Sequence, residues 1–150
     1  KKEYNHNDFD FESNITSYHL DMTVYDKNPR DFIELFSYVD SQENNSKAGQ
    51  KLSENILTLM SKISECLSKN IYQSSNIKNT VSFQLFGADV IFDDKLHTYL
   101  LELNKGPDMI PRDDVDKSMK KRVQEDMFRT VGLLPNNEKQ NVFFEVYSSK

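Results

Sequence analysis

The sequence predicts an α+β fold in which an antiparallel β-hairpin packs against amphipathic helices. Residues 47–73 place apolar side chains at spacings of three and four, which is typical of a helix with one buried face. Residues 80–104 combine β-branched and aromatic residues around a turn sequence, which is typical of a hairpin. A chain of 150 residues is long enough to close one hydrophobic core, so we expect a single domain over residues 1–150.

The N-terminal residues 1–46 have the least regular pattern. Residues 8–11 and 18–25 alternate apolar and polar side chains, which predicts short strands. Residues 41–46 form a polar run, SQENNS, which predicts a mobile loop. The chain opens with Lys1-Lys2 rather than methionine, so we expect a segment of a longer protein or a processed product.

The helix predicted over residues 47–73 separates its apolar and charged side chains. The apolar stripe consists of Leu52, Ile56, Leu59, Met60, Ile63, Leu67 and Ile71. The other face carries Lys51, Glu54, Lys62, Glu65 and Lys69. Such a stripe could bind a partner helix, but packing against a sheet is its commoner use, and this is the interpretation we favour.

The predicted hairpin is followed by a second helix and a last strand. Residues 80–92 run into the turn sequence Asp93-Asp94-Lys95, and residues 98–104 return. Residues 114–131 repeat valine and methionine at i, i+4 steps, with Gly132 where a helix stop is expected. Residues 141–147, NVFFEVY, predict the final strand.

The composition excludes two classes of partner. Lysine and arginine number 19 against 24 aspartates and glutamates, which leaves a net charge of −5. A nucleic-acid-binding protein needs a basic surface to neutralise phosphates, so we expect no nucleic-acid partner. No apolar run approaches the roughly 20 residues that span a bilayer, so we expect no membrane partner. A single cysteine, Cys66, indicates a reducing, intracellular setting.

The hairpin brings acidic residues together. A turn centred between Lys95 and Leu96 pairs residues whose numbers sum to 191, which sets Asp89 opposite Glu102 with Cβ atoms roughly 5 Å apart. Asn104 lies on the same face as Glu102, one pleat further along the strand. The opposite face is expected to be part of the core and carries Val90, Phe92, Leu101 and Leu103.

Two facing carboxylates predict a bound cation. At about 5 Å and an effective dielectric constant near 20, their repulsion is on the order of 3 kcal/mol unless a cation lies between them or one is protonated. Two carboxylates and an amide oxygen form a site that suits Mg²⁺ or Mn²⁺, and Mg²⁺ commonly completes its octahedron with waters and nucleotide phosphates. Asp89, Glu102 and Asn104 are therefore candidate ligands of a magnesium–nucleotide complex. A solvent-facing hairpin edge with scattered acids explains the residues equally well.

Residues 83–96, FQLFGADVIFDDKL, together with residues 99–104, YLLELN, and Pro107, resemble the tubulin–tyrosine ligase-like family. In that family a phenylalanine-glycine-x-aspartate strand precedes a leucine-x-glutamate-valine-asparagine strand that ends near a proline. The spacing of 13 residues from Asp89 to Glu102 matches, and residues 131–133 resemble the valine-glycine end of the family's closing helix. Residues 15–30 resemble it less, because Asp21 and Met22 replace threonine and asparagine.

The resemblance implies an ATP-grasp fold, in which ATP lies between two α+β lobes, and the chain resembles the C-terminal lobe. It implies an ATP-dependent ligase that activates a carboxylate as an acyl phosphate and joins an amine to it. The substrates would be acidic protein tails, usually of tubulin, extended by tyrosine, glutamate (polyglutamylation) or glycine in the cytoplasm or on the cytoskeleton. Asp89, Glu102 and Asn104 would hold the magnesium ions of ATP, with Lys105 as a further nucleotide contact and no residue assigned as a general base.

The resemblance also implies missing parts. In the family, the lobe with the phosphate-binding lysines lies N-terminal to the region matched here. We therefore expect that lobe, or a longer parent chain, as a partner, and an incomplete active site in this chain alone. The basic run Lys120-Lys121-Arg122 is interpreted as a solvated helix face rather than a site for the acidic tail. The alternatives are a non-catalytic binding or assembly module that kept the fold, and an unrelated α+β domain.

Overall fold

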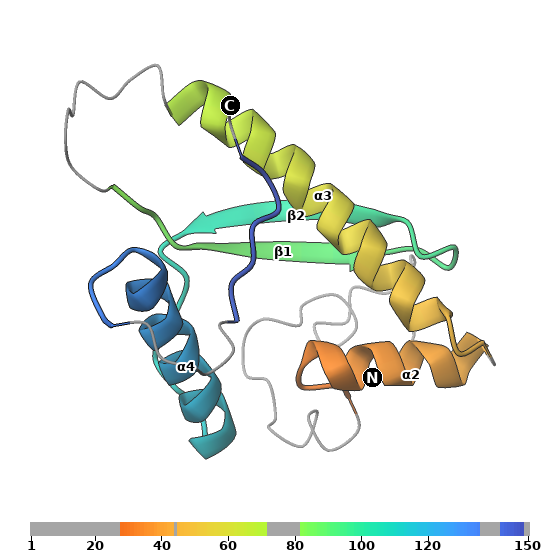
Figure 1. The fold of residues 1–150 in the computed structure, drawn as a ribbon. Helices are drawn as coiled ribbons and strands as arrows, with labels where there is room; N and C mark the ends of the chain where they lie inside the picture. The colour runs from red at the N-terminus through yellow and green to blue at the C-terminus, as the bar shows by residue number, and fades with distance from the viewer. Residues whose placement is uncertain (1–27, 44, 72–81, 136–141, 149–150) are drawn as a thin grey trace, which may run out of the picture. The chain divides into compact units, whose positions relative to one another are not determined.

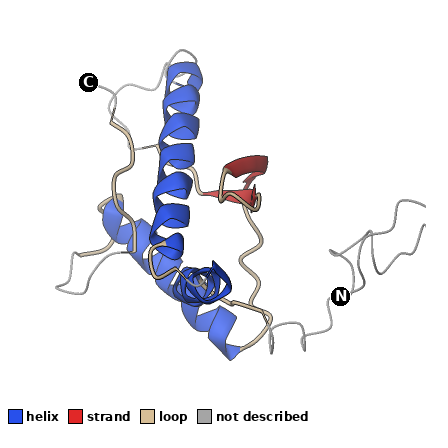
Figure 2. Ribbon diagram, turned by 90° about the vertical axis from the view of Figure 1, so that its right-hand side faces the viewer, coloured by secondary structure: helices blue, strands red, loops and turns tan. Residues whose placement is uncertain are grey.

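The computed structural model describes residues 28–43, 45–71, 82–135 and 142–148. They form, in chain order, α2 (Phe32–Glu43), α3 (Ala48–Ile71), β1 (Phe86–Phe92), β2 (Thr98–Lys105) and α4 (Asp114–Thr130) (Figure 1). The strands form one antiparallel pair, drawn red among the blue helices in Figure 2. The α+β class is confirmed. The chain divides into two compact units, Lys1–Gln50 and Lys51–Lys150, while one domain over residues 1–150 stays a prediction.

The helix α2 corrects the sequence-based prediction of irregular chain and a loop at 41–46, because residues 41–43 are its last turn. Its start is capped from both sides: the Glu34 amide donates to Asp31 Oδ1 at 2.8 Å, and the Arg30 amide donates to Glu34 Oε2 at 2.9 Å. This Asp-x-x-Glu pattern before an apolar run was the overlooked signal. The strands predicted at 8–11 and 18–25 lie outside the described residues.

The helix α3 confirms the helix predicted over 47–73 from residue 48 to residue 71, while residues 72 and 73 lie outside the described residues. Its first turn lies close to α2: the Gly49 amide donates to Asp40 Oδ1 at 2.8 Å, and a Cβ at Gly49 would lie 2.6 Å from the Phe36 carbonyl oxygen. Further along, Leu52 is fully buried. The rest of the stripe up to Leu67 is half-buried while the charged residues of the other face are exposed, as the periodicity predicted.

The hairpin turn is a three-residue loop held against α3. The Asp93 amide donates to the His97 carbonyl and the Leu96 amide donates to the Asp93 carbonyl, both at 3.0 Å. Leu96 takes the left-handed conformation at φ 66° that such loops require, and its side chain is buried. Asn55 Nδ2 on α3 donates to the Leu96 carbonyl at 2.8 Å, and Thr98 Oγ1 donates to the Asn55 carbonyl at 3.1 Å.

The first strand is shorter than predicted. Residues 82–85 are not a strand, and residues 80 and 81 lie outside the described residues. The first strand is short because its partner strand β2 ends at Lys105, which pairs with Phe86. The backbone then turns away from β1 at Gly106, whose φ is +78°. Residues 82–85 therefore have no continuation of β2 beside them, although the Gly106 amide still donates to the Leu85 carbonyl at 3.4 Å.

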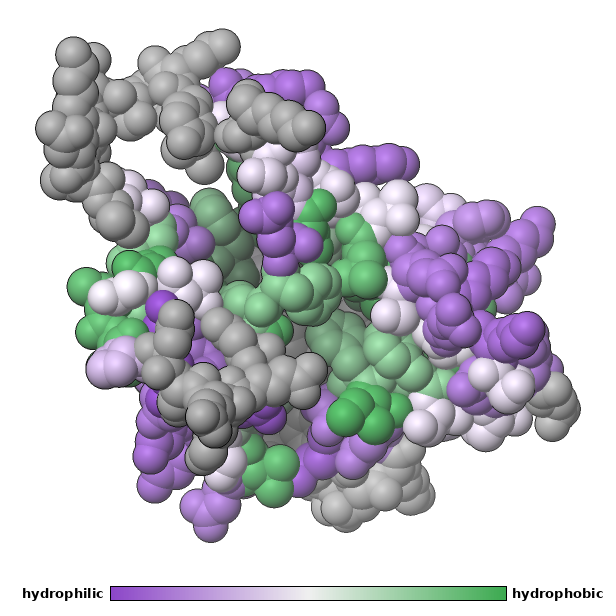
Figure 3. Space-filling view, in the orientation of Figure 1, coloured by the Kyte–Doolittle hydropathy of each residue, from purple (hydrophilic) through white to green (hydrophobic). Residues whose placement is uncertain are grey.

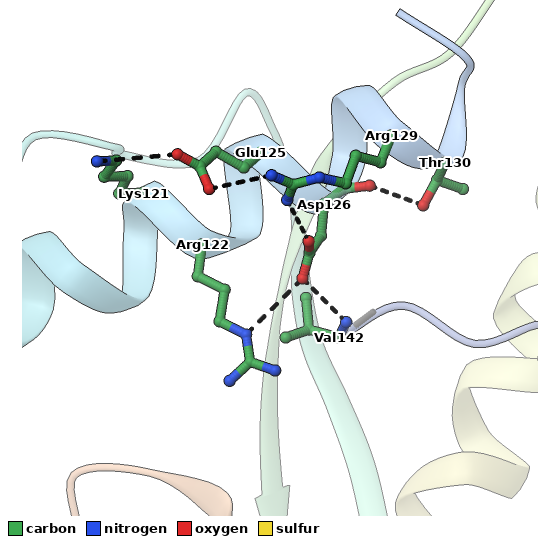
Figure 4. A network of polar contacts seen from close by, with 7 residues as sticks. All are labelled: Lys121, Arg122, Glu125, Asp126, Arg129, Thr130 and Val142. Atoms are coloured by element: carbon green, nitrogen blue, oxygen red, sulfur yellow. Dashed lines mark hydrogen bonds and ion pairs between the residues drawn. The ribbon is translucent and has the colours of Figure 1, made fainter. Parts of the chain in front are cut away.

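The helix α4 confirms the predicted second helix and its stop at Gly132, whose φ is +78°. Asp113 is the N-cap, accepting from the Asp116 amide at 2.8 Å. Near its C-terminal end, Asp126 is only 4% exposed and binds Arg129 Nη1 at 2.7 Å (Figure 4). Desolvation raises the pKa of Asp126, but the Val142 amide and the two neighbouring guanidinium groups outweigh it and lower the pKa below its usual value.

The C-terminal segment corrects the predicted last strand. Residues 142–148 contain no strand, and residue 141 lies outside the described residues. The Val142 amide, which a strand would use in a ladder, instead donates to Asp126 Oδ2 at 3.1 Å (Figure 4). An ionised, largely buried carboxylate is a stronger acceptor than a peptide carbonyl, so this contact ties the segment to α4.

Candidate magnesium–nucleotide site

One face of the hairpin carries the three predicted ligands. Asp89 pairs directly with Glu102, and Gly87 pairs with Asn104 two residues along each strand. Because side chains alternate across a strand, these positions point to the same side of the sheet. The pair Ile91 and Tyr99 continues this side towards the turn. We call this surface, made of Gly87, Asp89, Ile91, Tyr99, Glu102 and Asn104, the carboxylate face.

A β-bulge at Leu101 sets this arrangement. Between the turn and Val90, paired residue numbers sum to 190, and from Asp89 onwards they sum to 191. The predicted turn centre between Lys95 and Leu96 is therefore wrong, and the predicted pairing of Asp89 with Glu102 is right because β2 holds one extra residue. In a regular ladder from this turn, Glu102 would lie opposite Ala88 on the other face. The bulge thus brings both carboxylates to one side.

The face that was predicted to be core is only partly buried. Val90 and Leu103 are half-buried, but Phe92 is 36% exposed and Leu101 is 65% exposed. Leu101 is the extra residue of the bulge, so strict alternation does not apply to it. The prediction of a uniformly buried face is wrong at these two positions. Figure 3, in which apolar residues are green, shows apolar side chains on the surface between hydrophilic ones.

The polar side chains of the face contact one another. Asn104 Nδ2 donates to Glu102 Oε1 at 2.9 Å. With the amide nitrogen engaged in this way, Asn104 Oδ1 is the atom that can ligate a cation. Asp89, Glu102 and Asn104 are all exposed, so water screens the two carboxylates. At about 5 Å and a dielectric constant near 80 their repulsion is about 0.8 kcal/mol, well below the value expected for a partly buried pair.

The donor set fits a magnesium ion that brings further ligands with it. Within the described ranges, no three His, Cys, Asp or Glu side chains are grouped so that they could hold a metal ion. Two carboxylates and an amide oxygen leave half of an octahedron to waters and phosphate oxygens, which is how Mg²⁺ is usually held beside a nucleotide. These oxygens therefore suit an open site that is completed by other ligands rather than a closed protein cage.

One end of the carboxylate face is closed by Pro107. A Cβ atom built on Gly87 would lie 2.9 Å from Pro107 Cβ and 3.9 Å from Asn104 Cβ. Gly106 makes this possible, because its positive φ turns the chain back after β2. The glycine and the proline of the sequence motif are thus in direct contact beside Asn104.

The other end of the face is apolar and was overlooked in the sequence. Ile91 and Tyr99 are each 51% exposed and form the cross-strand pair next to the carboxylates. Counting two residues from Asp89 along β1 would have found Ile91, but Tyr99 required knowledge of the bulge. The Tyr99 hydroxyl donates to Asp93 Oδ2 at 3.2 Å, which raises the pKa of Tyr99 and joins this end of the face to the turn.

Asp93 organises the turn beside this apolar end. Its Oδ1 accepts from the amides of Lys95 and His97 at 3.0 and 2.8 Å, and its Oδ2 lies 2.9 Å from His97 Nδ1. Desolvation raises the pKa of Asp93, but these hydrogen bonds and that of Tyr99 outweigh it and lower the pKa to about 2. Asp93 therefore stays ionised at neutral pH as a structural acceptor.

The basic candidates are not on the carboxylate face. Lys105 pairs with Phe86 at the end of β2, and alternation places it on the opposite side of the sheet from Asn104. In α4, Lys120 is only 18% exposed at its side chain, binds Asp116 at 3.0 Å and donates to the Ile110 carbonyl at 2.8 Å. Lys121 and Arg122 are exposed, as expected of a solvated face, whereas Lys120 holds the start of the helix to the preceding loop.

The comparisons with known proteins agree with the motif. The model of the tubulin-tyrosine ligase family matches residues 2–141, which is nearly the whole chain. The search of the curated proteins and the search of the solved structures each found no significant match. Among the described residues, no helix combines the length and apolar character needed to cross a membrane.

Proposed function

The chain belongs to the tubulin-tyrosine ligase family, and on that premise we propose that its carboxylate face binds the magnesium ions of ATP in a protein amino-acid ligase. Membership supports an ATP-grasp fold and ATP-dependent ligation to protein tails in general. The observation that carries the finer proposal is the pairing of Asp89 with Glu102, with Asn104 on the same face. Three oxygen donors at one place on a sheet match the ligands that Mg²⁺ prefers.

The proposed roles follow from charge. Asp89 and Glu102 would ligate the ions as carboxylates, and Asn104 would add its amide oxygen while its nitrogen holds Glu102. Bound magnesium supplies positive charge to the phosphate that is transferred, which is electrostatic rather than covalent catalysis. None of these residues is assigned as a general base. Mn²⁺ has similar ligand preferences and is expected to substitute.

The shape of the face suggests how a nucleotide would lie. Pro107 closes the end next to Asn104, whereas Ile91 and Tyr99 extend the face at the other end with about half of each side chain exposed. We therefore place the phosphates over Asp89 and Glu102 and the apolar part of the nucleotide towards Ile91 and Tyr99. Aromatic and aliphatic side chains of this kind are the usual lining of nucleotide sites.

The substrate and partners belong to the same proposal. Family membership points to an acidic tail such as that of tubulin as the acceptor and to tyrosine or glutamate as the amino acid added, in the cytoplasm or on the cytoskeleton. An ATP-grasp lobe other than the one described here is expected to supply the remaining phosphate contacts. One domain over residues 1–150 that forms the C-terminal lobe of that fold is also part of this proposal, whereas the predicted nucleotide contact by Lys105 is not, because Lys105 lies on the other side of the sheet.

The test is nucleotide binding with a matched pair of variants. Isothermal titration of the protein with ATP in the presence of Mg²⁺ should give saturable binding that EDTA abolishes. Glu102→Gln should weaken that binding at least tenfold, about 1.4 kcal/mol, because a charged ligand is replaced by a neutral one. Asp94→Asn, which removes an exposed acid from the hairpin turn, should bind as the wild type does.

Two results would refute the proposal. One is the absence of magnesium-dependent binding, which would favour the alternative of a non-catalytic module that kept the fold. The other is equal affinity of the Glu102→Gln variant and the wild type, which would remove the carboxylate face from the site.

A further inference from the structure

Gly87 and Pro107 meet at the end of the carboxylate face. The strand position opposite Asn104 is Gly87, and the space that its Cβ would occupy is filled by Pro107. A Cβ there would lie 2.9 Å from Pro107 Cβ and 3.7 Å from Pro107 Cγ. Non-bonded carbon atoms normally approach to about 3.5–4.0 Å, so the proline ring fits only against a glycine.

The contact is built by the backbone on both sides. Gly106, at φ +78°, reverses the chain directly after β2. Its amide donates to the carbonyl of Leu85, two residues before Gly87, at 3.4 Å. Asn104 is three residues before Pro107 and is itself paired with Gly87. The glycine, the proline and the amide ligand therefore form a short closed loop of contacts.

We propose that the close contact between Gly87 and Pro107, which we call the steric lock, positions Asn104 for metal binding. The hydrogen bond from Asn104 then positions Glu102 as well. This rests on the proposed function of the carboxylate face. Pro107, seated on Gly87, fixes the path of residues 104–107, and the Asn104 amide then holds Glu102 Oε1 at 2.9 Å. Gly87 and Pro107 are positioning residues, since neither offers a side-chain ligand.

The size of the effect follows from the overlap. Relieving a contact of 2.9 Å requires the strand end or Pro107 to move by roughly half an ångström to one ångström. Ligand groups must be held within about 0.5 Å of their productive geometry. Loss of a group that orients a ligand typically lowers metal affinity by about 10–100-fold.

The test is a paired substitution measured with Mn²⁺ as the probe, by electron paramagnetic resonance of the free ion and by thermal unfolding in EDTA. Gly87→Ala should weaken Mn²⁺ binding by about tenfold or more. Pro107→Gly alone should also weaken it, but by a smaller factor, because residues 104–107 then lose their fixed path without being displaced. The double variant Gly87→Ala with Pro107→Gly should recover the affinity of Pro107→Gly, because the added methyl group then meets no ring.

A matched control distinguishes misplacement of the metal ligands from a general loss of folding stability. Gly132 has the same φ of +78° as Gly106, and a Cβ there would meet no atom within 4 Å. Gly132→Ala should lower the melting temperature by about 2–4 °C through backbone strain alone. Its Mn²⁺ affinity should equal that of the wild type, since Gly132 lies beyond the end of α4.

The outcomes are distinguishable. If Gly87→Ala loses stability but keeps its Mn²⁺ affinity, the contact is structural only and the inference is overturned. If the double variant is no better than Gly87→Ala, the lock is not steric, which also overturns it. If Gly87→Ala does not fold, the double variant must fold and bind for the inference to hold. Failure of the wild type to bind Mn²⁺ would overturn the proposed function as well.

Discussion

The pairing of Asp89 with Glu102 predicts that removing one charge stabilises the protein without metal and destabilises it with metal. The two carboxylates are exposed, and their repulsion in water is about 0.8 kcal/mol at a separation of about 5 Å. Asp89→Asn keeps the shape of the side chain and removes this repulsion. In EDTA at low ionic strength, the variant should therefore melt about 2–3 °C above the wild type for a chain of this length.

Addition of Mg²⁺ should reverse the order. A ligand at ten times its dissociation constant stabilises the folded state by RT ln 11, about 1.4 kcal/mol. The wild type should gain this amount, whereas the variant, with one carboxylate ligand fewer, should gain much less. The wild type should thus melt below the variant in EDTA and above it in saturating Mg²⁺. The melting temperatures are measured by circular dichroism or by scanning fluorimetry with an environment-sensitive dye.

Salt and a charge-matched variant supply the controls. The difference in melting temperature between Asp89→Asn and the wild type in EDTA should shrink in about 1 M NaCl, where the Debye length falls to about 3 Å. Asp94→Asn changes the net charge by the same amount in the turn and should show no exchange of order with Mg²⁺. Lower stability of Asp89→Asn in EDTA, or an equal gain of both proteins from Mg²⁺, would contradict the reasoning about facing carboxylates.

Two further predictions concern the fold and its pH dependence. Leu52→Ala should cost about 2–5 kcal/mol in urea unfolding, because Leu52 is fully buried, whereas Leu57→Ala at a 37% exposed position should cost far less; similar losses would contradict the burial pattern. Asp93 has a lowered pKa in the folded state, so its contribution to stability is complete above the unfolded value near 4 and is lost as the pH falls towards 2. Asp93→Asn should flatten the decline of the melting temperature in that window, and an unchanged decline would show that the turn contacts do not favour the carboxylate.

The local patterns were sufficient for the regular elements. The apolar spacing of α3 and the valine and methionine steps of α4 predicted both helices, because a helix that buries one face records that face every three or four residues. The same reasoning applied to α2 would have succeeded, since Asp31 and Glu34 form the capping pattern that starts it. The hairpin also followed from residues close together in the chain, whereas its Asp89–Glu102 pair was predicted from a turn centre that is wrong and is correct only because of the bulge at Leu101.

Other features depended on contacts that a linear pattern does not record. The predicted strand at 141–147 failed because the Val142 amide binds the carboxylate of Asp126, a residue on another element. The bulge at Leu101 has no signature in the residue itself, and it joins the register that the three-residue turn sets to the different register of the ladder from Asp89 onwards.

The sequence by itself determined the class of fold, the two long helices and the identity of the three oxygen donors, because these depend on side-chain type and short spacing. Only the tertiary structure decided on which face Glu102 lies, which apolar pair extends that face, and that Pro107 occupies the space left by Gly87. The physical reason is that register and close packing are set by pairs of residues that meet only after the chain has turned back on itself.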